Sequence, residues 1–240
     1  MKSRLLPLFP AEKPWATAVE PRRAVAAMML IFGTTICVKF LPRELTEVWR
    51  SAICASLETA GMLAAWLLVL PPGSSGGGLC GIFGAEPLKC RHFRWIVAAP
   101  LLIWSVNAAL GAVWIALLRR LGIPFEEMQK LIAEVRNFSS GEFLLVMLAV
   151  GVMTPMAEEF FFRRLLYGVL EPLGPRRAAL TTSLLFAAAH GFLVGFPGFL
   201  WMGLVFQLVY CRCRNLGAPI LVHAAINCVA LAGARAGWLT

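Results

Sequence analysis

Ionisable side chains stand inside long apolar stretches in the second half of this sequence. Glu158 and Glu159 are adjacent in one such stretch, and Arg163 follows four residues later. His190 and His223, two of only three histidines in the chain, lie in two further apolar stretches. Because burying an ionisable group in a membrane costs several kcal/mol, a sequence that keeps several of them there is typically using them. These residues are the candidate chemistry of the chain.

The first apolar stretch predicts both an ion pair and an irregular helix. Glu159 and Arg163 are four residues apart, so in a helix they share a face and can pair. Glu158 points about a quarter-turn away and is free to face a cavity. Pro155 cannot donate to the carbonyl of Gly151, so the helix should kink or loosen one turn before the glutamates.

The other two stretches repeat this four-residue spacing. Phe186 and His190 share one helix face, and His223 and Asn227 share another. Counted from the predicted cytoplasmic ends at about 1.5 Å per residue, His223 lies roughly 10 Å deep, and Glu158 and His190 lie roughly 20 Å deep. We therefore expect these side chains to converge on one water-accessible cavity.

The composition around these residues is that of a membrane protein. Of 240 residues, 59% are hydrophobic and 15% are charged, and the mean hydropathy is +0.75. A spanning helix needs about 20 mainly apolar residues. We predict an all-α, polytopic integral membrane bundle of about seven transmembrane helices. The expected spans are roughly residues 24–41, 51–70, 94–118, 142–168, 177–194, 197–211 and 217–234.

The net charge of +9 does not indicate nucleic-acid binding, because the basic residues are scattered between apolar runs. Their distribution between the loops favours a cytoplasmic N-terminus and an external C-terminus. The expected location is the cell membrane, most simply a bacterial inner membrane. The seven cysteines show no C-x-x-C spacing, which argues against a disulfide framework.

Three regions follow from this pattern. Residues 1–23 form a cytoplasmic N-terminal segment, residues 24–141 a variable N-terminal transmembrane region, and residues 142–234 a transmembrane core that contains the candidate residues. The second region contains the flexible loop 71–78 and an amphipathic stretch at 125–138. That amphipathic helix lies either in the membrane interface or as a cap on the bundle.

The core resembles the CPBP family of intramembrane proteases, which includes the CAAX-processing endopeptidases of the Rce1 type and the bacterial Abi proteins. Three of its motifs occur in order on three separate spans. Residues 158–163 match E-E-x-x-x-R, residues 186–190 match F-x-x-x-H, and residues 223–227 match H-x-x-x-N. The resemblance covers residues 142–234.

The resemblance implies a glutamate-dependent endopeptidase. Glu158, with His190, would activate a water for attack on a peptide carbonyl. His223 and Asn227 would stabilise the resulting oxyanion. No cofactor is required by this mechanism, although two histidines and a carboxylate could also hold zinc.

The same resemblance implies supporting roles and a substrate class. Glu159 and Arg163 would orient the site, and Phe186 would pack beside His190. The expected partners are the lipid bilayer and a protein or peptide with a membrane-associated C-terminal segment, with sorting-type cleavage favoured over removal of a prenylated tail. The alternative is a non-catalytic scaffold or bacteriocin-immunity protein that binds its partner through the same polar cavity.

Overall fold

The computed structural model describes residues 21–37, 45–69, 88–124 and 134–238, and these residues form helices without any strand. The α-helices are α1 (Pro21–Cys37), α2 (Glu47–Val69), α4 (Cys90–Arg120), α6 (Ser140–Leu148), α7 (Thr154–Glu159), α8 (Tyr167–Leu170), α9 (Pro175–Ala189), α10 (Phe196–Cys213) and α11 (Gly217–Ala236). Two π-helical stretches, η2 (Ala149–Met153) and η3 (Phe160–Leu166), and the 3-10 turn η4 (Glu171–Leu173) join α6, α7 and α8 into one long helical segment.

Within the described residues, four segments are long and apolar enough to cross a membrane: Cys90–Arg120, Ser140–Leu173, Phe196–Cys213 and Gly217–Ala236. The predicted helical membrane bundle is therefore confirmed, whereas the predicted count of seven spans is not. The fifth expected span, 177–194, corresponds to α9, which has only 15 residues. At about 1.5 Å per residue α9 extends roughly 22 Å, less than the roughly 30 Å of a bilayer core.

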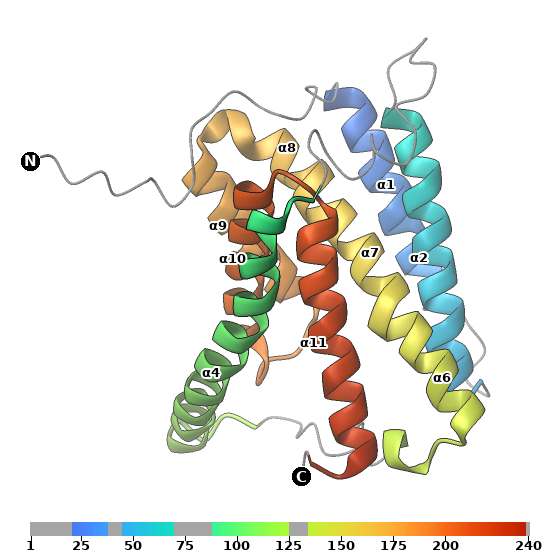
Figure 1. Cartoon of the computed structure of the whole chain (residues 1–240), viewed down its shortest axis with the longest axis vertical. Helices are drawn as coiled ribbons and strands as arrows, with labels where there is room; N and C mark the ends of the chain where they lie inside the picture. The colour runs from blue at the N-terminus through green and yellow to red at the C-terminus, as the bar shows by residue number, and fades with distance from the viewer. Residues whose placement is uncertain (1–20, 38–44, 70–87, 125–133, 239–240) are drawn as a thin grey trace, which may run out of the picture.

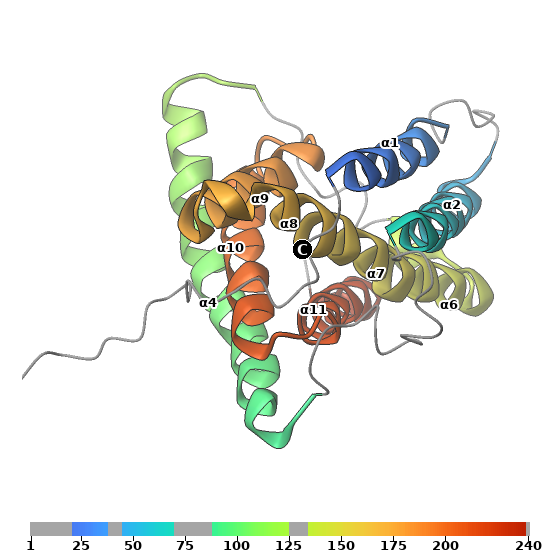
Figure 2. The same ribbon diagram turned by 90° about the horizontal axis from the view of Figure 1, so that it is seen from above.

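The long segment from α6 to α8 runs obliquely through the middle of the bundle (Figures 1 and 2). The helices α1 and α2 pair on one side of it, and α2 also packs on α6, η2 and α7. On the other side α10 packs against both α4 and α9, and α11 contacts α4, α10, η2 and α7. The central segment is thus enclosed by helices from both halves of the sequence.

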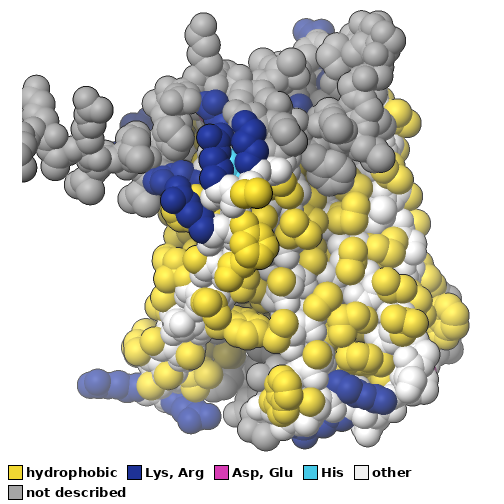
Figure 3. Space-filling view, in the orientation of Figure 1, with side chains coloured by type: hydrophobic (Ala, Val, Ile, Leu, Met, Phe, Trp, Pro, Cys, Tyr) yellow, Lys and Arg dark blue, Asp and Glu magenta, His cyan; other side chains and the backbone are white. Residues whose placement is uncertain are grey.

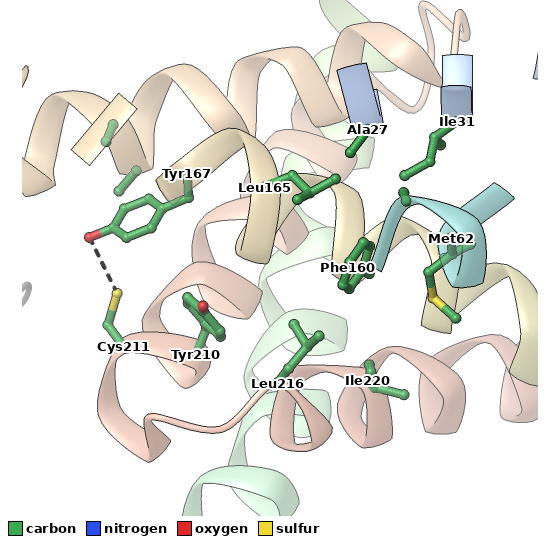
Figure 4. Close-up of a cluster of buried hydrophobic side chains, with 14 residues drawn as sticks. Ala27, Ile31, Met62, Phe160, Leu165, Tyr167, Tyr210, Cys211, Leu216 and Ile220 are labelled. Carbon is green, nitrogen blue, oxygen red and sulfur yellow. Dashed lines mark hydrogen bonds between the residues drawn. The ribbon is translucent and has the colours of Figure 1, made fainter. Parts of the chain in front are cut away.

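Two hydrophobic clusters hold this segment in place. The first, shown in Figure 4, joins α1 and α2 to Phe160 and Leu165 of the central segment and to Leu216 at the start of α11. The second joins Phe162 to Ile103 of α4 and to the facing sides of α9, α10 and α11. Because η3 contributes to both clusters, the residues on either side of Phe160 have little freedom to shift.

The predicted interfacial helix falls mostly outside the described residues, as do the N-terminal residues 1–20 and the loop 71–78. Residues 134–137 form a helical turn, which Arg235 of α11 connects to the end of the bundle. The Nη1 of Arg235 donates to the carbonyl of Arg136 at 3.1 Å and also to the carbonyl of Phe138.

Candidate active site

The glutamates lie where the central helix departs from α-helical geometry. The helix α7 ends at Glu159, with η2 before it and η3 after it. The predicted loosening near Pro155 is confirmed, because η2 immediately precedes the turn that contains this proline. Single π-helical turns of this kind are frequent at functional sites.

The widened turn leaves the backbone carbonyl of Val150 without a donor in its own helix, and the side chain of Asn227 donates to it. The N–H of Thr154 donates to the carbonyl of Ala149, five residues back, instead of to Val150. In the same register Val150 would need an N–H from Pro155, which has none. The Nδ2 of Asn227 donates to the Val150 carbonyl at 2.9 Å. Asn227 therefore connects α11 to the irregular turn, and its amide group keeps a second N–H for another acceptor.

Glu159 and Arg163 form the predicted ion pair. Glu159 Oε2 lies 3.0 Å from Arg163 Nε, and neither side chain is exposed. Three aromatic rings surround the guanidinium carbon of Arg163, at 4.8 Å from the ring centre of Phe186, 5.6 Å from Phe206 and 5.8 Å from Phe162. The cation is thus held by one carboxylate and by ring faces that favour positive charge.

His223 faces both glutamates. Its Nδ1 lies 3.0 Å from Glu159 Oε1, and its Nε2 lies 3.9 Å from Glu158 Oε2. Because Glu159 also pairs with the Arg163 cation, its carboxylate accepts from the ring, and Nδ1 carries the proton. In a neutral ring the Nε2 of His223 is then unprotonated and directed toward Glu158. The ring stacks on Phe206, with 4.6 Å between the ring centres.

Glu158 is the more accessible of the two carboxylates. Its side chain keeps 26% of its surface exposed, whereas Glu159 is fully buried. The Oε2 atom of Glu158 is itself buried and accepts no hydrogen bond from the described residues. The site therefore contains one carboxylate held by fixed partners and a second one that can accept a proton.

His190 ends α9, and a backbone hydrogen bond fixes its ring. Its Nδ1 lies 2.8 Å from the carbonyl oxygen of Phe186. A carbonyl only accepts, so Nδ1 is the protonated nitrogen, and Nε2 of the neutral ring is left as a proton acceptor. The ring stacks on Phe199, with 3.9 Å between centres. The Phe186 ring lies 4.7 Å from the ring centre of His190 and 5.9 Å from that of His223, so it links the two histidines.

The turn after His190 is tightly constrained. Gly191 has a φ of 62°, a left-handed conformation that favours glycine and ends the helix. At Gly195 an added Cβ would lie 2.5 Å from a ring carbon of Phe199, so no larger residue fits there without displacing the ring that stacks on His190. From α4, Trp114 Nε1 donates to the carbonyl of Leu193 at 3.0 Å.

A third carboxylate, which none of the three motifs contains, lies beside the site. Glu58 of α2 and Cys54, one turn before it, are both within electrostatic range of Glu158. Cys54 Sγ donates to Glu58 Oε1 at 3.4 Å, and Oε2 is buried without a hydrogen-bond partner among the described residues. In the sequence, Glu58 can be recognised only as a charged residue within an apolar run. The packing of α2 against α7 brings it near Glu158.

The described residues do not offer a three-ligand metal site. No three His, Cys, Asp or Glu side chains in this part of the chain are arranged so that they could hold a metal ion. A catalytic zinc requires three protein ligands and an open position. The mechanism proposed below uses side chains alone.

Comparison with known proteins agrees with the motif pattern. Residues 140–229 match the family model described as type II CAAX prenyl endopeptidase Rce1-like. This segment contains all three motifs, and the resemblance is confirmed. The two π-helical turns, the paired glutamates and the two histidines all belong to this Rce1-like segment.

Two curated proteins are similar to part of this chain. The membrane-embedded CAAX protease MroQ of Staphylococcus aureus (strain USA300) is 32% identical over 85 residues, which cover 32% of this chain and 34% of the relative. YdiL of Bacillus subtilis (strain 168), named as a candidate membrane peptidase, is 29% identical over 84 residues, which cover 35% of this chain and 34% of the relative. The chain thus spans about a third of the length of these relatives. No solved structure shows a significant match.

Proposed function

We propose that this chain is an intramembrane endopeptidase of the glutamic type, which hydrolyses a peptide bond near the C-terminus or membrane anchor of a protein substrate. The observation that carries the proposal is the position of His223 between two unequal carboxylates, one fixed by Arg163 and one able to accept a proton. The names of the similar proteins support the class, because both are described as membrane proteases or peptidases.

In the proposed mechanism Glu158 is the general base. Together with the unprotonated Nε2 of His190 it draws a proton from a water molecule, whose oxygen attacks the peptide carbonyl. Glu158 passes this proton to the Nε2 of His223 and so returns to its ionised form. The protonated Nε2 of His223 and the second amide N–H of Asn227 then stabilise the oxyanion. When the carbon–nitrogen bond breaks, the leaving amine takes the proton from His223, and the ring becomes neutral again.

The other residues hold this arrangement. Glu159 accepts from Nδ1 of His223 and so supports the positive charge that this ring acquires, as a buried carboxylate does for a catalytic histidine in other hydrolases. Arg163 pairs with Glu159 in the apolar core and fixes the position of its carboxylate. Phe186 separates the two histidines and packs against both rings.

The proposed orientation has a cytoplasmic N-terminus in a bacterial cell membrane. Among the described residues, basic side chains gather at one end of the bundle (Figure 3), where α4 and α9 begin and α10 ends (Figure 1). Such a gathering is typical of the cytoplasmic side. A tail-cleaving enzyme of this kind would meet its substrate within the bilayer, and sorting-type release of a membrane-embedded anchor is the proposed reaction.

The proposal is tested by identifying products. The purified chain is incubated in detergent with peptides that end in an apolar membrane segment, and products are analysed by mass spectrometry before and after extensive chelation. We expect a single hydrolysed bond and unchanged turnover after chelation. Loss of activity on chelation with recovery on added zinc would refute the metal-free mechanism.

The scaffold alternative predicts a different outcome in cells. If binding alone suffices, His190→Ala and Glu158→Gln chains should both complement a deletion strain. If hydrolysis is the function, both should fail to complement while accumulating in the membrane at wild-type levels.

A further inference from the structure

Two arginines from different helices stack on one tryptophan at the end of the bundle. The guanidinium carbon of Arg94 on α4 lies 5.7 Å from the ring centre of Trp95, and that of Arg212 on α10 lies 5.3 Å from the same centre. Trp95 packs against the hydrophobic cluster that joins α4, α10 and α11. The indole is therefore anchored to the core, and both guanidinium groups contact this one ring.

This pair lies where two candidate spans end. Arg94 is in the second turn of α4, which begins at Cys90, and Arg212 is in the last turn of α10, which ends at Cys213. Below Arg94 the outer face of α4 is apolar, and Leu101 on this face is 63% exposed. Figure 3 shows the same division, with basic side chains gathered at this end above a broad hydrophobic surface. The boundary between them is where headgroups of a bilayer would lie.

The charges of the pair are not neutralised within the described part of the chain. No carboxylate there forms an ion pair with Arg94 or Arg212, and the first turn of α4 contains no acidic residue. A guanidinium that stacks through its face keeps its N–H groups at the edge for hydrogen bonds. The N–H groups of the two guanidinium ions can therefore donate to several oxygens of one phosphate group.

We propose that Arg94, Arg212 and Trp95 form a binding site for the phosphate headgroup of an anionic glycerophospholipid. The headgroup bridges α4 and α10, and its acyl chains lie along the apolar face of α4 below Arg94. The lipid thus fastens α4, whose span is only 11% buried, to the helix that supplies Phe206 and Phe199 to the candidate active site. The proposal does not depend on peptide cleavage.

The test compares two double variants of the full chain with equal loss of charge. Arg94→Gln with Arg212→Gln removes the proposed site, and Arg119→Gln with Arg120→Gln removes two basic residues from the opposite end of α4. Each chain is titrated in neutral detergent with phosphatidylglycerol or phosphatidylcholine, with bound lipid counted by native mass spectrometry and the unfolding temperature measured. Because each basic residue near an anionic lipid contributes about 1 kcal/mol, the first variant should bind phosphatidylglycerol roughly 10- to 30-fold more weakly than the second.

Several results would overturn the proposal. The first is an equal affinity of both double variants for phosphatidylglycerol. The others are that phosphatidylcholine or millimolar inorganic phosphate stabilises the wild type as much as phosphatidylglycerol does. Displacement of the lipid by an acidic peptide at equal concentration would assign the surface to a protein partner instead. If the first double variant does not fold, Arg94→Gln alone is compared with Arg119→Gln, and an unchanged number of bound lipids refutes the site.

Discussion

Replacing Arg163 by Met should destabilise the protein strongly, because it leaves the Glu159 carboxylate without its cation. Both side chains are fully buried and lie 3.0 Å apart. Removing one member of a buried pair typically costs about 3–5 kcal/mol, because the remaining charge is uncompensated. For a chain of this size, about 1 kcal/mol corresponds to a change of roughly 2–4 °C in unfolding temperature. Arg163→Met should therefore lower that temperature by about 6–20 °C, measured by circular dichroism in detergent.

A double-mutant cycle separates the charge from the packing. Glu159→Gln combined with Arg163→Met removes both charges, so the double variant should unfold at a higher temperature than the sum of the single changes predicts. Arg119→Met, at the exposed end of α4, serves as the matched control and should stay within about 2 °C of the wild type. The reasoning is refuted if Arg163→Met behaves like this control, or if the two changes are strictly additive.

Three further predictions concern the surroundings of the glutamates. Asn227→Ala should lower the free energy of unfolding by about 1–2 kcal/mol by leaving a buried carbonyl unpaired, and the added change Pro155→Ala, which restores a backbone N–H, should reduce that cost; equal costs in both backgrounds would contradict this. Gly151→Ala should cost about 1–3 kcal/mol, because its Cβ would lie 2.8 Å from the Sγ of Cys228, and Cys228→Ala should restore most of the loss in a thermal melt. Glu58→Gln should lower kcat about three- to tenfold with little change in KM, because negative charge beside the base helps it to hold the proton taken from water; an unchanged kcat would remove α2 from the site.

Contacts within one helix were predictable from the sequence. The Glu159–Arg163 pair depends only on the four-residue spacing, and the irregular turn depends only on the missing N–H of Pro155. Both are confirmed, because each involves atoms one helical turn apart.

Contacts between helices were not predictable in the same way. Spacing shows that His223 and Asn227 share a face, but not that His223 contacts both glutamates or that Asn227 holds the Val150 carbonyl. The joint action of Glu158 and His190 on water stays a prediction, and the structure adds that His223 Nε2 lies within 4 Å of Glu158 Oε2. The crossing of α7 and α11, which hydropathy does not encode, determines this contact.

The predicted count of seven spans is not confirmed for a related reason. An apolar run predicts a helix, but it does not distinguish a helix that crosses a bilayer from a shorter one. The helix α9 has 15 residues and ends at Ala189, because Gly191 adopts a left-handed conformation. This ending leaves the ring of His190 stacked on Phe199 of α10.

The most direct test of the central claim is the steady-state rate of peptide hydrolysis by Glu158→Gln, which keeps the shape of the side chain but removes its ability to accept a proton. Because a general base contributes about 100- to 10,000-fold, kcat should fall by at least about 100-fold with KM nearly unchanged. Glu142→Gln, which removes a carboxylate from the start of α6, should retain wild-type kcat. A Glu158→Gln enzyme that keeps more than about a tenth of the wild-type kcat would contradict the account.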